Sequence, residues 1–313
     1  MKIAFFGTPD FAVPVLESLI NSHHEVILAV SQPDRPKGRD MQIDQTPVKK
    51  IALKSGITVL QPVKCTDPAF ISEYKKLTPD INIIVAFGQI LPDEIIYHPK
   101  FASVNIHASL LPKYRGASPI NWAVINGDKE TGITYQFIEK RLDAGDIINV
   151  ERIAIEESDD AVSMFLKLSE LSGDTVVKVV NMIAAGKTQR IKQDESKATT
   201  VKTLKKEEGR LDFNLPAKSI VNKIRGLVPW PCAYCSLKGR SLKILSASTG
   251  QCPPGSESSA PGTITGFAKG LGFYIKAADT CVIAKTVQPD SGKKMSGTDF
   301  ANGQKDLVGL RLE

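Results

Sequence analysis

Five short apolar runs, separated by segments with helical spacing, constrain the fold of this chain more than any other feature. They cover residues 2–7, 25–31, 57–60, 80–86 and 102–107. Strands that alternate with helices are typical of a mostly parallel sheet covered on both faces. A long amphipathic segment over residues 160–186 ends at Gly186 and closes this part. The sequence therefore predicts an α/β, Rossmann-like, doubly wound parallel sheet over residues 1–189.

The last third of the chain has a different pattern. Short strand candidates, separated by Gly and Pro, occur at Ala233–Leu237, Ser241–Leu245, Phe273–Lys276 and Cys281–Ala284. This spacing predicts a smaller, OB-like β-barrel over residues 207–313. Residues 190–206 are polar and basic and are predicted to form a linker.

Composition is that of an ordinary globular protein, with 42% hydrophobic and 24% charged residues. The sequence shows no run near the ~20 apolar residues that a membrane span needs. The opening Met1–Gly7 is too short and too weakly basic for a secretory signal and reads as a first strand. We therefore expect a cytoplasmic protein without a membrane partner.

Five cysteines, an odd number, argue against a disulfide framework. Cys232 and Cys235 have the spacing of a metal or redox pair. The sequence shows no second Cys or His pair near them, so we expect two reduced cysteines in a strand and no metal.

Charge is concentrated in the C-terminal third. From residue 198 to the end there are 17 basic and 9 acidic residues, a net charge of +8, whereas the whole chain carries +6. The first 197 residues therefore carry −2. Such an imbalance favours a polyanionic partner, because basic residues that neutralise phosphates release counterions. A solvated basic surface is the alternative.

Candidate catalytic residues are Asn105, His107 and Asp143. Asn105 and His107 lie two apart in a predicted strand, so both side chains project from one face. An amide N–H and an imidazole can stabilise the oxyanion that forms when a nucleophile adds to a carbonyl, and a carboxylate can keep the imidazole protonated. Taken singly, the histidine is more often a core residue, and the aspartate in Leu142–Asp146 a turn former.

The segments that follow strengthen the catalytic interpretation. Ser109–Pro112, followed by Lys113–Pro119, resembles the folate-dependent formyltransferases. The resemblance implies that Asn105, His107 and Asp143 are catalytic, that 10-formyltetrahydrofolate is the co-substrate, and that no metal takes part. It also implies a cis peptide bond before Pro112. The residues that we expect to bind folate are Ser109, Leu110, Leu111, Pro112, Phe87, Gly88, Ile90 and Leu91.

Both ends of the chain resemble the branch of this family that formylates the methionyl group on initiator tRNA. The similar segments are Met1–Ala12, Gln32–Arg39, Lys205–Phe213, Arg225–Pro231 and Gln288–Lys294. Initiator methionyl-tRNA is therefore the expected partner of a protein that we predict to be monomeric. The expected tRNA-binding residues are Arg35, Lys37, Arg39, Lys205, Lys206 and Arg210.

The sequence departs from the family pattern beside Asp143. In Ile138–Asp143 the family usually has an acidic pair and a glycine before the leucine, whereas this chain has Lys140 and Arg141, and Ala144 replaces a frequent threonine. Three other functions stay open at this point: an amino-sugar formyltransferase, a purine-pathway formyltransferase and a non-enzymatic RNA-binding module. A dinucleotide site is disfavoured, because Gly7–Ala12 lacks the second and third glycines of that fingerprint.

Overall fold

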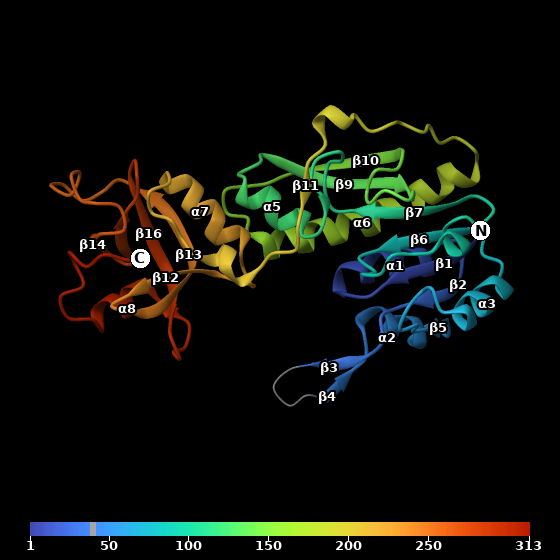
Figure 1. The fold of residues 1–313 in the computed structure, drawn as a ribbon, viewed down its shortest axis with the longest axis horizontal. Coiled ribbons are helices and arrows are strands. Elements are labelled where there is room, and N and C mark those ends of the chain that lie inside the picture. Colours follow the sequence, from blue (N-terminus) through green and yellow to red (C-terminus); the bar gives the residue numbers. More distant parts are fainter. Residues whose placement is uncertain (38–41) are drawn as a thin grey trace. The chain divides into compact units, whose positions relative to one another are not determined.

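Figure 1 shows the computed structural model, which describes residues 1–37 and 42–313. These residues form two compact units. Unit 1 comprises Met1–Gly116, Thr131–Ala154 and Phe165–Thr200, and unit 2 comprises Ala117–Glu130, Ile155–Met164 and Val201–Glu313. The boundaries of catalytic domain, linker and C-terminal domain stay predictions.

Unit 1 is built on a seven-stranded sheet in the order β10-β9-β7-β6-β1-β2-β5. Neighbours from β7 to β5 are all parallel, whereas β9 runs antiparallel to β7. The predicted parallel sheet is therefore confirmed, with an antiparallel edge of two strands that the prediction omitted. The strands are β1 (Lys2–Gly7), β2 (Glu25–Val30), β5 (Thr58–Leu60), β6 (Ile81–Val85), β7 (Ala102–His107), β9 (Glu130–Phe137) and β10 (Ile147–Ala154).

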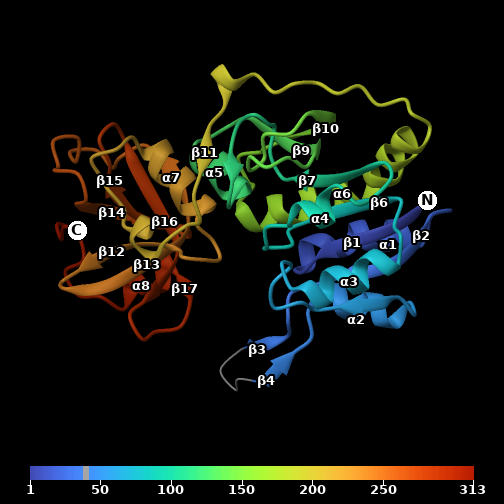
Figure 2. The ribbon, with the colours of Figure 1, turned by 45° about the vertical axis from the view of Figure 1, so that its right-hand side comes forward.

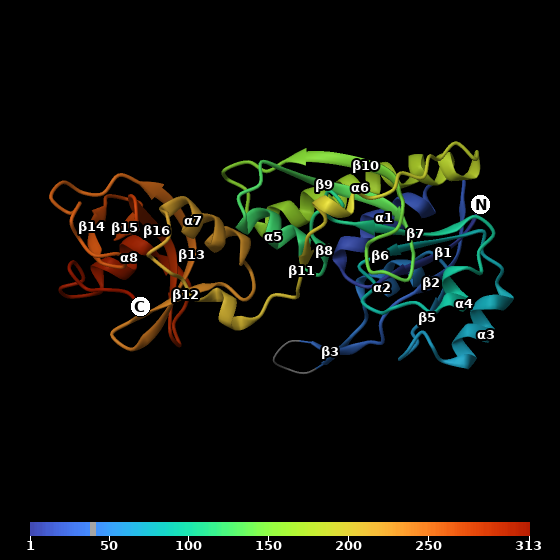
Figure 3. The ribbon, with the colours of Figure 1, turned by 45° about the horizontal axis from the view of Figure 1, so that its top comes forward.

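Helices pack on both faces of this sheet, because alternate side chains of each strand point to opposite faces. Ala4 and Phe6 belong to a buried cluster with Phe70 and Ile95 from the helices α3 and α4. On the other face Tyr135 donates a hydrogen bond from its hydroxyl to a carbonyl of α6. Figure 3 shows β9 and β10 at one edge of the sheet with α6 alongside. The helices are α1 (Val13–Ile20), α2 (Pro47–Lys54), α3 (Pro68–Lys76), α4 (Asp93–Ile96) and α6 (Ala161–Ala184), with 3-10 turns η1 (Asp10–Ala12) and η2 (Glu195–Lys197).

A small antiparallel hairpin, β3 (Arg35–Lys37) and β4 (Gln42–Asp44), projects from unit 1 (Figure 2). A polar cluster holds its base: Asp34 pairs with Lys49, and the Gln61 amide donates to both Asp34 and the Gln32 carbonyl. Thr46 caps α2 by accepting a hydrogen bond from the amide of Lys49.

Unit 2 contains an antiparallel sheet in the order β12-β13-β16-β15-β14, with β17 beside β16. The predicted strands are confirmed, but the closed barrel is not. In the described part of the chain β12 and β14 do not pair. Instead, Glu313 exchanges backbone hydrogen bonds with Ser236 of β12, and the carbonyl of Leu310 accepts one from Ile264 of β14. A C-terminal tail thus bridges edge strands that a barrel would join directly.

The elements of unit 2 follow the predicted pattern of short strands. They are η3 (Lys206–Gly209), α5 (Pro119–Ile125), α7 (Ala217–Gly226), β12 (Ala233–Leu237), β13 (Arg240–Gly250), β14 (Ile264–Ala268), β15 (Gly272–Lys276), β16 (Cys281–Pro289), β17 (Met295–Ser296) and α8 (Gly297–Asn302). A two-stranded ladder pairs β8 (Arg115–Gly116) with β11 (Thr200–Val201). Within the described ranges, no helix is both long and apolar enough to cross a membrane.

One cysteine prediction is wrong: Cys252 and Cys281 form a disulfide. The odd number of cysteines left room for a single bridge, and the strand register supplies it. Gly250, the last residue of β13, lies opposite Cys281 at the start of β16, so residue 252 is close by. Cys232 and Cys235 are reduced, as predicted, and both are buried. Cys235 lies in the predicted strand, β12, whereas Cys232 directly precedes it.

Candidate active site

Strand β7 places Asn105 and His107 on the same face of the sheet, as their spacing predicts. The antiparallel neighbour β9 aligns Gln136 with Asn105 and Thr134 with His107. Side chains directly opposite in such a pair share a face. Four polar side chains from two strands are therefore collected at one place.

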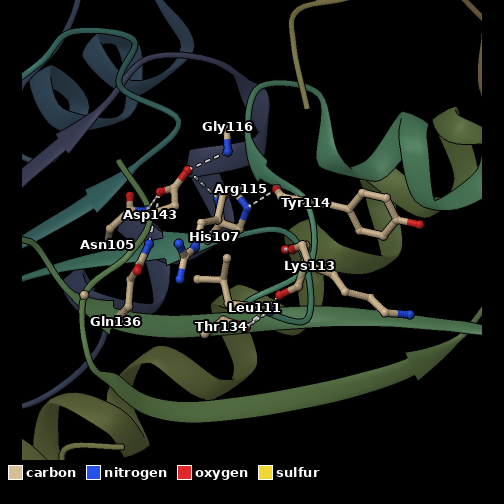
Figure 4. A network of polar contacts seen from close by, with 12 residues as sticks. Asn105, His107, Leu111, Lys113, Tyr114, Arg115, Gly116, Thr134, Gln136 and Asp143 are labelled. Atoms are coloured by element: carbon tan, nitrogen blue, oxygen red, sulfur yellow. Dashed lines mark hydrogen bonds and ion pairs between the residues drawn. The ribbon is translucent and has the colours of Figure 1, made fainter. Parts of the chain in front are cut away.

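The Asp143 carboxylate lies at the centre of this group (Figure 4). Its Oδ1 accepts hydrogen bonds from Asn105 Nδ2 at 3.3 Å and from Gln136 Nε2 at 3.0 Å. Its Oδ2 accepts one from the Gly116 backbone amide at 2.9 Å. Asp143 has a φ of 50°, a left-handed conformation that is uncommon for a residue other than glycine. These hydrogen bonds hold the carboxylate in one orientation.

His107 is placed between two oxygen acceptors. Its Nε2 is 2.9 Å from the carbonyl oxygen of Tyr114, and its Nδ1 is 3.6 Å from Asp143 Oδ2. A carbonyl can only accept, so Nε2 carries a proton. Only 8% of the His107 side chain and 9% of the Asp143 side chain are exposed, so solvent screens this pair weakly. The two ring nitrogens therefore face the carbonyl oxygen of Tyr114 and the carboxylate of Asp143.

A cavity of about 290 Å³ adjoins the carboxylate. Its polar lining residues include Asn105, Gln136 and Asp143. Its apolar lining residues include Ile84, Ile90, Leu91 and Ile96. An apolar cleft with a few convergent polar groups is typical of a site for a small organic molecule. Ile90, which is 89% exposed, lies at this cavity as an uncovered apolar side chain.

Other predicted folate-binding residues lie outside the cavity wall. Ser109 is buried, and its hydroxyl donates to the carbonyl of Lys113. Leu111 donates its backbone N–H to Thr134 Oγ1, and the predicted cis bond between Leu111 and Pro112 is confirmed. Of the predicted folate-binding residues, Ile90 and Leu91 line the cavity. The others do not line it: Ser109, Leu110, Leu111, Pro112, Phe87 and Gly88.

The residues that depart from the family pattern form ion pairs near the cavity. Lys140 Nζ is 3.3 Å from Asp93 Oδ2, and both residues line the cavity. Arg141 Nη2 is 2.7 Å from Glu195 Oε2. All four side chains are more than half exposed, so each pair contributes little to stability.

The predicted tRNA-binding residues are distributed over two segments. Arg35 is exposed on β3, which also contains Lys37, and Arg39 lies outside the described residues. Lys205, Lys206 and Arg210 are exposed in and around η3 of unit 2. In the part of the chain that the structure describes, no group of three His, Cys, Asp or Glu side chains could hold a metal ion.

Sequence reasoning missed the residues that surround Asp143. Gln136 and the amide of Gly116 bond its carboxylate, and Gln193 bonds its backbone carbonyl. Gln136 lies on a strand that the prediction omitted. The alternation of apolar and polar residues over Ile133–Phe137 was the available sequence signal.

Comparisons with known proteins agree with this geometry. The family model "Formyl transferase" matches residues 1–180, and "Formyl transferase, C-terminal domain" matches residues 203–305. A methionyl-tRNA formyltransferase from Sulfurihydrogenibium is 42% identical, with 100% of both chains covered. The methionyl-tRNA formyltransferase of Bacillus subtilis is 41% identical, covering 100% of this chain and 99% of the relative.

A solved structure of similar fold is the N-formyltransferase from Helicobacter canadensis in complex with folinic acid and dTDP-3-aminofucose. It superposes with a TM-score of 0.68 at 18% identity, covering 94% of this chain and 100% of that chain. At this identity the likeness shows the fold alone. The matched models and the full-length relatives, by contrast, show the family: the chain belongs to the formyl transferases, together with the methionyl-tRNA formyltransferases that match its whole length.

Proposed function

We propose that this formyltransferase moves a formyl group from 10-formyltetrahydrofolate to the amino group of methionyl-tRNA, with Asn105, His107 and Asp143 as its catalytic set. The convergence of these three side chains, two of them beside an apolar cavity, is the observation that carries the proposal. The full-length relatives named methionyl-tRNA formyltransferase support the choice of acceptor.

The cavity suits the flat, polar ring system of a folate. Ile90 and Leu91 offer apolar contact, and Asn105 and Gln136 offer hydrogen bonds. Ser109, Leu110, Leu111 and Pro112 support the site from behind, since Thr134 links the Ser109 carbonyl and the Leu111 amide beside His107. Phe87 and Gly88 follow the carboxyl end of β6, the strand next to β7.

In the transfer, a bond forms between the amine nitrogen and the formyl carbon, the bond from that carbon to N10 breaks, and a proton passes from the amine to N10. Asn105 donates one N–H to Asp143 and has a second for the developing oxyanion. His107 adds positive charge nearby. Asp143 orients His107 and accepts and returns the proton in transit. One oxyanion donor typically contributes roughly 2–4 kcal/mol to lowering the barrier.

The remaining roles rest on charge and location. We infer that Arg35, Lys37, Arg39, Lys205, Lys206 and Arg210 bind tRNA phosphates, and that residues 1–189, 190–206 and 207–313 are the catalytic domain, linker and tRNA-binding domain. We propose that the protein is cytoplasmic, because an enzyme of initiator tRNA acts where translation starts. We also propose that it is a monomer.

Steady-state formylation by His107→Ala and Asp143→Asn tests the catalytic set. We expect kcat to fall at least ~10²-fold with little change in the KM for tRNA, because the lost interactions act in the transition state. His98→Ala is the matched control, since this histidine packs against Tyr74 and does not line the cavity beside Asp143.

Near-normal rates in both variants contradict the catalytic assignment. Acceptor choice is tested by offering the wild-type protein methionyl-tRNA or a nucleotide-linked amino sugar. A preference for the sugar contradicts the proposed substrate but leaves the catalytic set intact.

A further inference from the structure

A strap formed by residues 190–195 runs antiparallel beside residues 141–147. Arg190 Nε is 3.0 Å from Asp146 Oδ2, and Ile191 exchanges two backbone hydrogen bonds with Ile147. In Figure 1 the chain leaves α6, passes along the sheet edge and returns toward β11. Residues predicted to be a plain linker thus make ordered contacts with unit 1.

Gln193 connects this strap to the turn that bears Asp143. Its Nε2 donates to the carbonyl oxygens of Asp143 and Gly145, both at 2.8 Å, and lies 3.2 Å from Gln136 Oε1. The two short bonds use both N–H groups of the amide. One side chain therefore ties together two backbone oxygens of the turn and a polar residue of the site.

Arg115 fixes the orientation of the Gln193 amide. Its Nε and Nη2 donate to Gln193 Oε1 at 3.0 and 2.7 Å. Arginine has only donors, so the amide oxygen must face it and the NH₂ group must face the turn. Arg115 is 5% exposed and also bonds both carboxylate oxygens of Glu195. Hydrogen bonds from Arg115 and Arg141 lower the pKa of Glu195 to about 2, so Glu195 stays ionised well below neutral pH.

The Asp143 turn needs such support. Its left-handed φ is disfavoured for a residue with a side chain, and no such conformation persists unless its surroundings hold it. Gly145 is pressed against the Phe137 carbonyl, where a Cβ would collide with that oxygen. Gln193 bonds the carbonyl oxygens of these same two residues, Asp143 and Gly145.

We propose that Gln193, oriented by the buried Arg115, is a positioning residue that sets the Asp143 carboxylate for formyl transfer. The inference rests on the proposed function, because it assumes that Asp143 is catalytic. It also gives a role to Arg115 in the Lys113–Pro119 segment, which the catalytic set leaves unexplained.

Gln193→Glu tests the proposal in wild-type and Asp143→Asn backgrounds. The substitution keeps the side chain's size and an acceptor for Arg115, but turns an oxygen toward two carbonyls. We expect kcat to fall about tenfold or more, with each KM within about twofold, since small displacements of catalytic groups are costly. In the Asp143→Asn background we expect less than about a twofold effect, because residues acting through one another are not additive.

Gln288→Glu is the matched control: its half-buried amide donates to the Gly292 carbonyl at 3.0 Å in unit 2, and kcat should not change. Because the charge of Gln193→Glu can unfold the strap, Gln193→Ala is measured in parallel with its thermal midpoint, and the same dependence on Asp143 is expected.

Two results overturn the role of Gln193: an unchanged kcat in a folded variant, or an equal loss in both backgrounds. A normal kcat for Asp143→Asn alone instead overturns the proposed catalytic set.

Discussion

At the scale of single residues, burial keeps the free thiols of the protein protonated. It raises the pKa of Cys65 and of Cys235 to about 12, and it raises the pKa of Cys232 as well. Because the thiolate is the reactive form, we expect iodoacetamide at pH 8 to modify none of the three in the folded protein. Mass spectrometry after unfolding should show all three modified. Rapid labelling of Cys235 in the folded state contradicts the burial.

The same shift gives a stability prediction. Folded Cys65 and Cys235 hold their protons more tightly than the unfolded chain, whose thiol pKa is about 9. The free energy of unfolding should therefore fall as pH rises from about 9 toward 12, and Cys65→Ala should reduce that fall. Urea unfolding across this pH range measures it, and equal pH slopes in both proteins are the contrary result.

Residue-level sequence reasoning identified part of the site. The period of two put Asn105 and His107 on one face because it depends on local geometry alone. The approach of Asp143 depends on β9, which precedes it, and no local pattern reveals that approach. Gln193 lies in a polar segment, and its contact with the turn involves residues fifty positions away. Such contacts are set by the fold.

At the scale of secondary-structure elements, α5 and α7 meet at a glycine. A Cβ on Gly226 would lie 2.9 Å from the Ile125 backbone nitrogen and 3.0 Å from the Asn121 carbonyl oxygen. Gly226→Ala should therefore lower the free energy of unfolding by about 1–3 kcal/mol, although alanine is the better helix former. Gly303→Ala is the control, because its new Cβ has no neighbour closer than 3.5 Å. Equal denaturation midpoints for both variants contradict the close packing.

Secondary structure was predicted correctly where the local sequence of a strand identifies it. It was missed where a segment forms a strand only because it pairs with its neighbours. β1 and β6 are mostly buried and rich in apolar residues, and β2 is apolar after its first residue, so these segments can be recognised as strands without their neighbours. β9 and β10 contain charged and polar residues and are strands because they pair with each other and with β7. The closed barrel was not confirmed for a related reason. Closure is a property of the whole sheet, and here the C-terminal tail bonds to β12 and β14 where these edge strands would pair with each other.

At the scale of the whole molecule, the uneven charge has a measurable consequence. Residues 198–313 carry a net +8, and Lys205, Lys206 and Arg210 are exposed within that region. If they neutralise tRNA phosphates, replacing all three by alanine raises the KM for tRNA and flattens its dependence on salt. Each lost contact removes about one unit from the slope of log affinity against log salt concentration.

A control with the same loss of charge separates contact from net charge. Lys64, Lys75 and Lys76 are exposed in unit 1, so their replacement by alanine also removes three positive charges. We expect this variant to keep the wild-type salt slope, because counterions are released only where phosphates are contacted. The KM for the folate should stay the same in both variants, since the cavity is built from other residues of unit 1. Formylation rates over a salt series measure all of this: equal slopes in both triple variants assign the effect to net charge, and a raised KM for the folate indicates a general loss of stability.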